Sequence, residues 1–425
     1  MKGRFKRLSV FAAAVFFLAL QAVSAAANNP LADRIDAVVV KGKDIPEHML
    51  NGSIPSYRVF ADSGAGLNAI PFQIDERGPD GMIHVSKGPY ADATDGKFGT
   101  FDELVFMARD AGQPPANNKI EGCSKSVEIK IADKKTGATG YVVLAFCENP
   151  PALSTRDYVS YDAQHRIVTS SRYGFAWKTG DVYPYDYLSI NNGPDLLDRL
   201  KVRAAVGKWG INYTFNEDHF RHKFNGYTDG PVRVIWKSYD CWSLGPLGKI
   251  AVPQYMYFYE DYALINDAMD ARMNPALFGL ELDVMISHDL ALDQSRGYVF
   301  CGNVSPGCEN MIKLPEQRIK YLTDQHMDWG GVSGPEGALM THLVPDKRLN
   351  VRVKGIFIND DQYKDPPEYI PGSSPKVGFE LVDWKNVKPA VYDLDFYHFF
   401  FSKYSPEEFA RFDRVITNPL AVTIK

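Results

Sequence analysis

The chain has 425 residues, 13% aromatic and 23% charged, with a formal net charge of −5 at pH 7. The high aromatic content argues against intrinsic disorder, and the mildly acidic charge argues against nucleic acid or anionic lipid as the main partner. The length is sufficient for one large β-rich domain or for two domains of average size.

The first 27 residues have the three parts of a secretory signal peptide. Four basic residues among the first seven precede an apolar run over residues 8–20, and small residues at 23–27 offer a cleavage site. The apolar run is too short for a comfortable membrane span, and no later stretch reaches spanning length. We therefore expect an exported protein, periplasmic or secreted, whose mature chain begins near residue 28 and has no transmembrane segment.

Most of the chain is predicted to form short β-strands. Runs rich in Val, Ile, Phe and Tyr, bounded by Gly, Pro, Asn or Asp, lie at 37–40, 57–60, 69–74, 104–107, 127–131, 141–145, 232–237 and 351–357. Helical patterning is sparse. Apolar residues at roughly helical spacing indicate one segment at 195–206, and Ser405, Pro406 and Glu408 begin a capped helix near 405–417. These patterns predict a mainly β fold with one or two antiparallel β-sandwich domains and a few peripheral helices.

A change of character near Pro150 suggests a domain boundary. Before it the pattern is a compact run of strands, and after it come longer segments with many Tyr, Trp and His residues. We therefore expect a signal peptide at 1–27, an N-terminal β domain at 28–150, and a larger β-sandwich domain at 151–425 that ends in the C-terminal helix.

The five cysteines predict two disulfides, because an oxidising compartment permits them. Cys123 and Cys147 flank two β-type runs, and a hairpin turn between the runs would place the two residues opposite each other. Cys301 and Cys308 bracket a turn-rich loop that a disulfide would close. Cys241 is left over, either as a buried thiol or as a reactive or intermolecular one.

Four short patches carry a resemblance to a known group of proteins. They are Ile-Pro-Phe-Gln-Ile-Asp-Glu at 70–76, Asp-Glu-Leu-Val-Phe-Met-Ala at 102–108, Gly-Pro-Val-Arg-Val-Ile at 230–235 and Tyr-Phe-Tyr-Glu at 257–260. This set resembles exported bacterial β-sandwich proteins with no settled activity, whose sheets are similar to the large sandwiches of sugar mutarotases and polysaccharide lyases. The resemblance implies a sandwich fold and a carbohydrate ligand, and it transfers no catalytic residue.

The densest polar cluster contains Glu217, His219, Arg221 and His222. In an extended strand Glu217, His219 and Arg221 would share one face, with His222 on the other. A polysaccharide lyase needs a base to remove the proton beside a uronate carboxylate and a cation to stabilise the resulting charge. The cluster therefore predicts the catalytic residues of a lyase or hydrolase, with a solvated strand end as the alternative.

Two segments offer ligands for a divalent metal such as calcium. In the first, Asp324, His326 and Asp328 alternate, so that an extended chain would place them on one face. The second contains three aspartates around a glycine turn: Asp92, Asp95 and Asp102. Its spacing does not follow the EF-hand pattern, so it would form only an irregular calcium site. The alternative for both segments is a polar loop or turn.

Tyrosines alternate in two places, and a strand would put each trio on one face. The trios are Tyr183, Tyr185 and Tyr187, and Tyr255, Tyr257 and Tyr259. Sugars present flat C–H faces that stack on aromatic rings, and phenol hydroxyls bond to sugar hydroxyls. Trp242, with Trp236 and Trp329, would extend such a surface. The alternative is ordinary cross-strand packing between tyrosines.

These features predict an exported carbohydrate-interacting protein that binds a glycan or another extracytoplasmic ligand through its aromatic stripes. One alternative is a polysaccharide lyase or hydrolase that uses the cluster at 217–222. Another is a non-catalytic structural or assembly protein of the cell envelope. No motif in the chain fixes a reaction.

Overall fold

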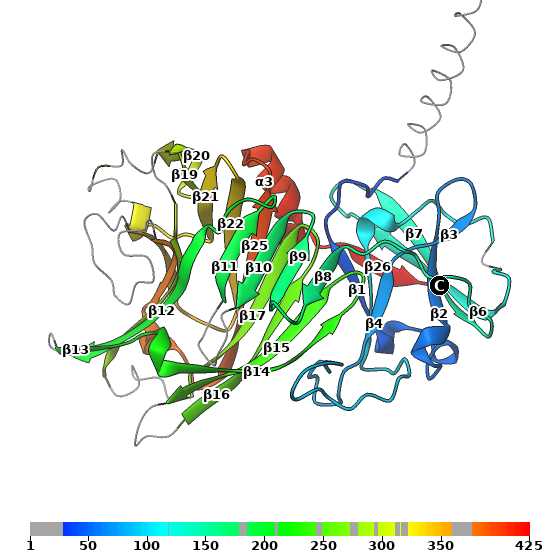
Figure 1. Ribbon diagram of the computed structural model, residues 1–425, viewed down its shortest axis with the longest axis horizontal. Coiled ribbons are helices and arrows are strands. Elements are labelled where there is room, and N and C mark those ends of the chain that lie inside the picture. Colours follow the sequence, from blue (N-terminus) through cyan, green and yellow to red (C-terminus); the bar gives the residue numbers. More distant parts are fainter. Residues whose placement is uncertain are drawn as a thin grey trace, which may run out of the picture. The chain divides into compact units, whose positions relative to one another are not determined.

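The computed structural model describes residues 29–117, 119–177, 185–208, 211–243, 249–272, 279–292, 296–310, 315, 322–358 and 376–425. The predicted signal peptide lies outside these residues. Antiparallel strands dominate the described structure and helices are few, which confirms the predicted mainly β fold (Figure 1).

No helix in the described part of the chain is long and apolar enough to cross a membrane.

The chain forms two compact units, and neither unit is one continuous stretch of sequence. The first contains the residues up to Ile83 together with Asp95–Arg156 and Arg411–Lys425; the second contains His84–Thr94 and Asp157–Ala410. One of the four crossings between the units lies close to the boundary predicted near Pro150. The other three reflect long-range contacts, such as the isolated bridge of Lys87 to Tyr227 and the pairing of β26 with β6, which local composition does not reveal.

The described residues of the first unit form a three-stranded sheet, β1-β5-β4, and a five-stranded sheet, β26-β6-β7-β2-β3. The strands are β1 (Ala37–Lys41), β2 (Tyr57–Asp62), β3 (Leu67–Ala69), β4 (Phe72–Asp75), β5 (Glu103–Met107), β6 (Cys123–Ala132), β7 (Thr139–Cys147) and β26 (Ala421–Ile424). Val38, Phe106, Ile129 and Leu144 contribute to one buried hydrophobic core. The last strand, β26, pairs with β6 and therefore belongs to this unit, whereas the predicted larger domain extended to residue 425.

Arg34 joins three distant segments of the first unit and is 1% exposed. Its guanidinium donates two hydrogen bonds to Asp36, one to Asp133 at 2.9 Å, and one to the carbonyl of Asn418 at 2.8 Å. Burial raises the pKa of Asp133, but hydrogen bonds from the Asn418 side chain and from backbone N–H groups, with the charge of Arg34, outweigh it and hold that pKa well below its usual range.

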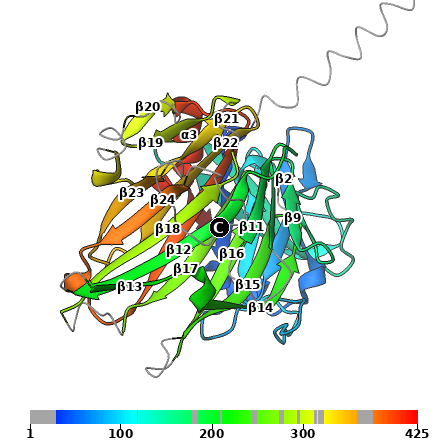
Figure 2. The ribbon, with the colours of Figure 1, turned by 60° about the vertical axis from the view of Figure 1, so that its left-hand side comes forward.

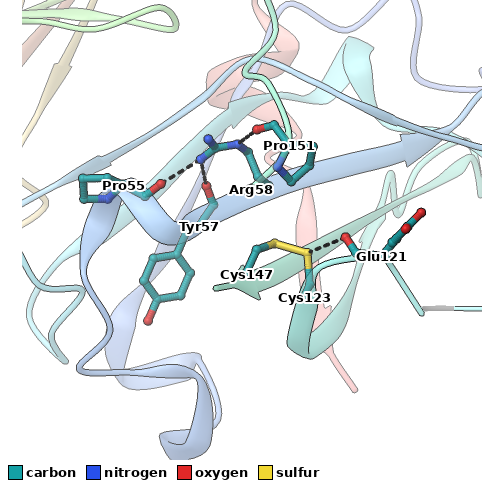
Figure 3. The surroundings of a disulfide bond; sticks show 7 residues. All are labelled: Pro55, Tyr57, Arg58, Glu121, Cys123, Cys147 and Pro151. Carbon is teal, nitrogen blue, oxygen red and sulfur yellow. Dashed lines mark hydrogen bonds between the residues drawn. A yellow bond between two sulfur atoms is a disulfide. The ribbon is translucent and has the colours of Figure 1, made fainter. Parts of the chain in front are cut away.

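Both predicted disulfides are present. Cys123–Cys147 joins β6 to β7, and Cys301–Cys308 joins β19 (Val299–Gly302) to β20 (Ser305–Asn310). Figure 3 shows the first bond near Arg58, whose guanidinium donates to the carbonyls of Pro55 and Pro151. Among the described residues the free thiol is that of Cys241, which is partly exposed.

Replacing Cys123 and Cys147 together with serine is expected to lower the free energy of unfolding of the first unit by about 3 kcal/mol. The bond spans 24 residues, and closing a loop of that length restricts the unfolded chain. The matched control replaces Cys301 and Cys308, which are 7 residues apart and should cost about 2 kcal/mol. Denaturant unfolding of the two variants measures both values, and a larger loss for the short loop would contradict the loop-length account.

The second unit is a β-sandwich in which three sheets share one hydrophobic core (Figure 2). In the described residues the sheets have the orders β14-β15-β16-β17-β25-β22-β21-β19-β20, β13-β12-β18-β24-β23 and β11-β10-β9-β8. The remaining strands are β8 (Val159–Asp162), β9 (Ile167–Ser170), β10 (Tyr173–Trp177), β11 (Tyr185–Ile190), β12 (Leu197–Lys208), β13 (Ile211–Phe215), β14 (Phe220–Asp229), β15 (Val234–Ser243), β16 (Lys249–Phe258), β17 (Tyr262–Asp270), β18 (Glu281–Leu290), β21 (Trp329–Gly334), β22 (Gly337–Pro345), β23 (Arg352–Ile358), β24 (Lys376–Val382) and β25 (Val391–Phe401).

The helical spacing at 195–206 is misleading, because these residues form most of strand β12. Leu200 and Val202 lie in the core, and the alternating Arg199, Lys201 and Arg203 are buried as well. Residues 199–204 do alternate polar and apolar side chains, as a strand does, but the polar face is buried together with the apolar one.

The predicted C-terminal helix is present as α3 (Pro406–Phe412), followed by the short α4 (Arg414–Thr417). The Ser405 hydroxyl accepts the backbone N–H of Glu408 at 3.1 Å, as the predicted cap requires. The ring of Phe409 stacks on Trp329 with centroids 4.0 Å apart, so Trp329 packs against the helix.

Candidate functional site

The structure divides the predicted catalytic cluster. Glu217 and His219 lie in the 3-10 helix η6 (Glu217–His219), whereas Arg221 and His222 lie in β14. The shared strand face expected for Glu217, His219 and Arg221 therefore does not form. The Glu217 carboxylate is fully buried, His222 is buried, and Arg221 is exposed. His219 Nδ1 lies 2.7 Å from the side-chain oxygen of Asn216.

Glu217 instead belongs to a buried ionic network on β12. Its carboxylate forms an ion pair with Arg199 at 2.7 Å and a second, closer pair with Arg203. In the same layer, Lys201 lies 2.8 Å from Asp289. These side chains are buried, so the network is part of the interior.

The segments predicted to bind metal do not assemble into metal sites. Across the described residues no group of three His, Cys, Asp or Glu side chains is arranged to hold a metal ion. In the Asp324, His326 and Asp328 segment, His326 Nδ1 donates to the carbonyl of Val353 at 3.0 Å, and its Nε2 lies 2.7 Å from Asp328. The polar-loop alternative therefore describes this segment.

The three aspartates of the predicted calcium loop stabilise turns instead. Asp92 accepts the N–H of Val85 and the ammonium of Lys237, and Asp95 accepts the N–H of Lys97. Asp102 accepts backbone N–H groups from Arg77 and Gly99.

The first tyrosine trio does not form an exposed stripe. Tyr183 and the side chain of Trp242 lie outside the described residues. A register shift between β10 and β11 places Tyr185 in the hydrophobic core with Leu188, while Tyr187 stays partly exposed. Trp236, the other predicted extension, is also buried in the core.

The second trio is largely buried. Tyr255 is 9% exposed and Tyr259 is 4% exposed, whereas Tyr257 is partly exposed. The rings of Tyr255 and Tyr257 stack with centroids 6.3 Å apart. The guanidinium of Arg233 lies 5.0 Å from the centre of the Tyr257 ring. Of this trio, Tyr257 is the residue that a ligand can reach.

Tyr257 belongs to a polar and aromatic patch that the strand order assembles. Tyr257 pairs with Leu264, Leu264 with Tyr397, and Tyr397 with His342, across β16, β17, β25 and β22. The next row contains the pair of Asn266 and Asp395. We call Tyr257, Asn266, His342, Asp395 and Tyr397 the central patch.

The central patch faces away from the hydrophobic core. Its sequence neighbours Met256, Ile265, Leu343 and Phe396 are core residues, and successive side chains of a strand point to opposite faces. All five patch residues are partly exposed. The patch is therefore a surface that offers two phenol rings, an imidazole, an amide and a carboxyl group.

Hydrogen bonding and burial set the properties of the patch. The Asn266 side-chain nitrogen donates to the Asp395 carboxylate at 2.7 Å. Burial raises the pKa of Asp395, and the hydrogen bond from Asn266 partly offsets that shift. Burial and the neighbouring charge of Asp395 also raise the pKa of Tyr397. Amide and carboxyl groups beside aromatic rings suit a hydroxyl-rich ligand that is flat on one face.

Of these residues, the sequence patterns predicted only Tyr257 as part of a binding surface. A signal for the others was present in β25, where Asp393, Asp395 and Tyr397 alternate with the core residues Leu394 and Phe396. That alternation indicates a strand with one face outside the core. It does not indicate which strands lie beside it.

A buried polar network lies on the core side of the same strands. The Tyr185 hydroxyl is 2.7 Å from His288 Nε2 and 3.4 Å from His398 Nε2, and the Thr341 hydroxyl is 2.9 Å from His398 Nδ1. Burial lowers the pKa of His288 to about 4, and burial together with the neighbouring His288 lowers the pKa of His398 well below its usual value. A cavity of about 20 Å³ adjoins the network, which is room for one water molecule.

No protein-family model matches the chain, and no curated protein matches it. Similar solved structures include an alpha-mannosidase from Enterococcus faecalis V583, with a TM-score of 0.49 and 9% identity over 92% of this chain and 44% of that one. A glycosyl hydrolase family 38 protein from Enterococcus faecalis has a TM-score of 0.47 and 8% identity over 92% and 46% of the two chains. A beta-arabinopyranosidase has a TM-score of 0.26 and 7% identity over 59% and 41%. The chain spans less than half the length of each of these structures, and similarity at this level carries no information on function.

Proposed function

We propose that the protein is an exported carbohydrate-binding protein and that a glycan lies across the central patch. The observation that supports this function is the placement of two partly exposed tyrosines, Tyr257 and Tyr397, beside the hydrogen-bonded Asn266 and Asp395 on an outward sheet face. The rings would stack on the C–H faces of sugar residues, and the amide and carboxyl groups would bond to sugar hydroxyls.

The charges around the patch favour a neutral glycan over an acidic one. Asp395 would repel a uronate or sulfate group at the centre of the patch. Two cations on the neighbouring strand β15 side of the patch have protein partners: Lys237 forms an ion pair with Asp92 at 2.9 Å, and Arg233 donates to the Tyr259 hydroxyl at 3.2 Å. We therefore expect stronger binding to uncharged polysaccharides.

Export is supported by the two disulfides together with the signal-peptide pattern of residues 1–27. Disulfides such as Cys123–Cys147 and Cys301–Cys308 persist in oxidising compartments and are rare in the cytosol. The resemblance to exported β-sandwich proteins stays a prediction.

Replacing Tyr257 with alanine is expected to weaken glycan binding about tenfold, because a lost stacking ring costs on the order of 1 kcal/mol or more. Affinity electrophoresis in gels that contain xylan, mannan, β-glucan, alginate or polygalacturonate measures the retardation of wild type and variant. The matched control is Tyr213→Ala, since Tyr213 is 57% exposed and lies outside the patch. Equal loss of binding in both variants would place the glycan elsewhere.

The same incubations distinguish the other functions. Unsaturated products or new reducing ends would indicate a lyase or hydrolase, and their persistence in both His219→Ala and His222→Ala would exclude the predicted catalytic cluster. Absence of binding to every polysaccharide would contradict the proposed function and favour a structural role in the cell envelope.

A further inference from the structure

We propose that His288 and His398 make the central patch sensitive to acid: when these buried rings take up protons, the sandwich opens locally and glycan binding weakens. The effect on binding rests on the proposed function. The opening itself does not, because it can be measured in the absence of any glycan.

The buried network and the central patch occupy opposite faces of the same strands. Thr341 and His342 are consecutive in β22, and Tyr397 and His398 are consecutive in β25. Thr341 and His398 point into the core, where they are hydrogen-bonded to each other, while His342 and Tyr397 belong to the patch. A displacement of either strand at the network therefore moves the patch residues too.

The network also connects the three sheets of the sandwich. Tyr185 comes from β11, His288 from β18 and His398 from β25, and each of these strands belongs to a different sheet. The Tyr185 hydroxyl is within hydrogen-bond distance of both imidazoles, and the two rings have centroids 5.0 Å apart. Breaking these bonds releases contacts between sheets rather than within one sheet.

The network is built for neutral imidazoles. A neutral ring has one N–H donor and one acceptor nitrogen, so the Tyr185 hydroxyl can donate to one ring and accept from the other. A protonated ring has two donors and no acceptor. Among the described residues that line the cavity, the other titratable groups are Tyr185 and Asp267, and the Asp267 carboxylate already accepts a hydrogen bond from Gln254. One carboxylate cannot balance two imidazolium charges.

The sign of the pH dependence follows from the lowered pKa values. The closed state holds the pKa of His288 at about 4 and that of His398 below its usual value. In an open, hydrated state both pKa values return to about 6.5. Closure is therefore fully stable above about pH 6.5 and loses stability as the pH falls toward 4. Protonation of one ring shifts the opening equilibrium about tenfold per pH unit in that range. Protonation of both rings together shifts it by up to about a hundredfold per pH unit.

Hydrogen exchange of the intact protein tests the opening without a glycan. Mass spectrometry follows peptides from β22 and β25 between pH 7 and 4.5, after correction for the intrinsic exchange rate. In wild type the opening constant should rise by up to about a hundredfold per pH unit below 6.5, and in His398→Asn or His288→Asn by about tenfold. His326→Asn is the matched control, because His326 is exposed and outside the network.

An opening constant whose pH dependence is the same in wild type and in both network variants would overturn the proposal. If the variants fail to fold, NMR titration of the wild-type imidazole protons decides instead. Two histidines that stay neutral to below pH 5 would support the proposal, and ordinary titration of all of them near 6.5 would overturn it.

The binding consequence has its own measurement. For a polysaccharide of the panel that binds at pH 7.5, the apparent dissociation constant should rise as the pH falls, in proportion to the lost closed fraction. His398→Asn should make the apparent dissociation constant depend less steeply on pH. Asp395→Asn removes only the direct titration of the patch carboxyl group. If no polysaccharide binds, the proposed function fails, and the exchange experiment still decides the acid-driven opening.

Discussion

Replacing Glu217 with alanine is expected to destabilise the second unit by about 3–5 kcal/mol. The substitution removes the carboxylate that Arg199 and Arg203 share inside the sandwich and leaves two buried guanidinium groups without it. All six tryptophans of the chain lie in this unit, so their fluorescence during denaturant unfolding measures the loss directly.

The control is Glu281→Ala. Glu281 is an exposed glutamate on β18, the strand beside β12, and we expect its replacement to change the free energy of unfolding by no more than about 0.5 kcal/mol. A further variant replaces Arg199, Glu217 and Arg203 together with apolar residues of similar volume. It should recover most of the lost stability, since an apolar layer needs no internal charge balance. A Glu217→Ala protein as stable as wild type would show that the network does not stabilise the fold.

Replacing Arg34 with alanine is expected to destabilise the first unit by about 3–5 kcal/mol, because Asp36 and Asp133 lose a buried partner. The unit contains no tryptophan, so its opening is followed by limited proteolysis or by hydrogen exchange of β6 and β26. The second unit should keep its wild-type fluorescence transition.

Arg34→Lys is the informative comparison. Lysine keeps the charge but cannot donate two parallel bonds to Asp36 while also reaching Asp133 and Asn418. We expect it to recover less than half of the lost stability. Because the pKa of Asp133 is lowered in the folded state, the ionised Asp133 carboxylate stabilises the fold above about pH 4, and this stabilisation is lost as the pH falls below that value. Full rescue by lysine would show that charge alone matters.

Features fixed by local sequence could be predicted. The Cys123–Cys147 disulfide follows from two strand runs around one turn, and the helix start at Ser405 follows from its capping residues. Strand β12 has a period-two alternation at residues 199–204, but the leucines at 196, 197 and 200 imitate helical spacing, so the local pattern alone is ambiguous. The pairing of β26 with β6 joins residues nearly three hundred positions apart, so no local pattern reports it.

The candidate site shows the same limit. Tyr257 was found because it is one of three alternating tyrosines, but its partners come from β17, β22 and β25, whose order in the sheet is not the order in the sequence. Glu217 shows the converse. Its sequence neighbours suggested a catalytic cluster, whereas its true neighbours are two arginines of β12 that the fold brings to it.

The interleaving of the two units has a consequence for how the protein matures. The first unit begins near the N-terminus, yet its five-stranded sheet is complete only when β26, at residues 421–424, pairs with β6. The part of the protein that is synthesised first is therefore finished last. A chain that stops before Ala421 leaves the edge of β6 unpaired, and an unpaired strand edge is a template for association with other chains. A chain that includes β26 covers that edge of β6.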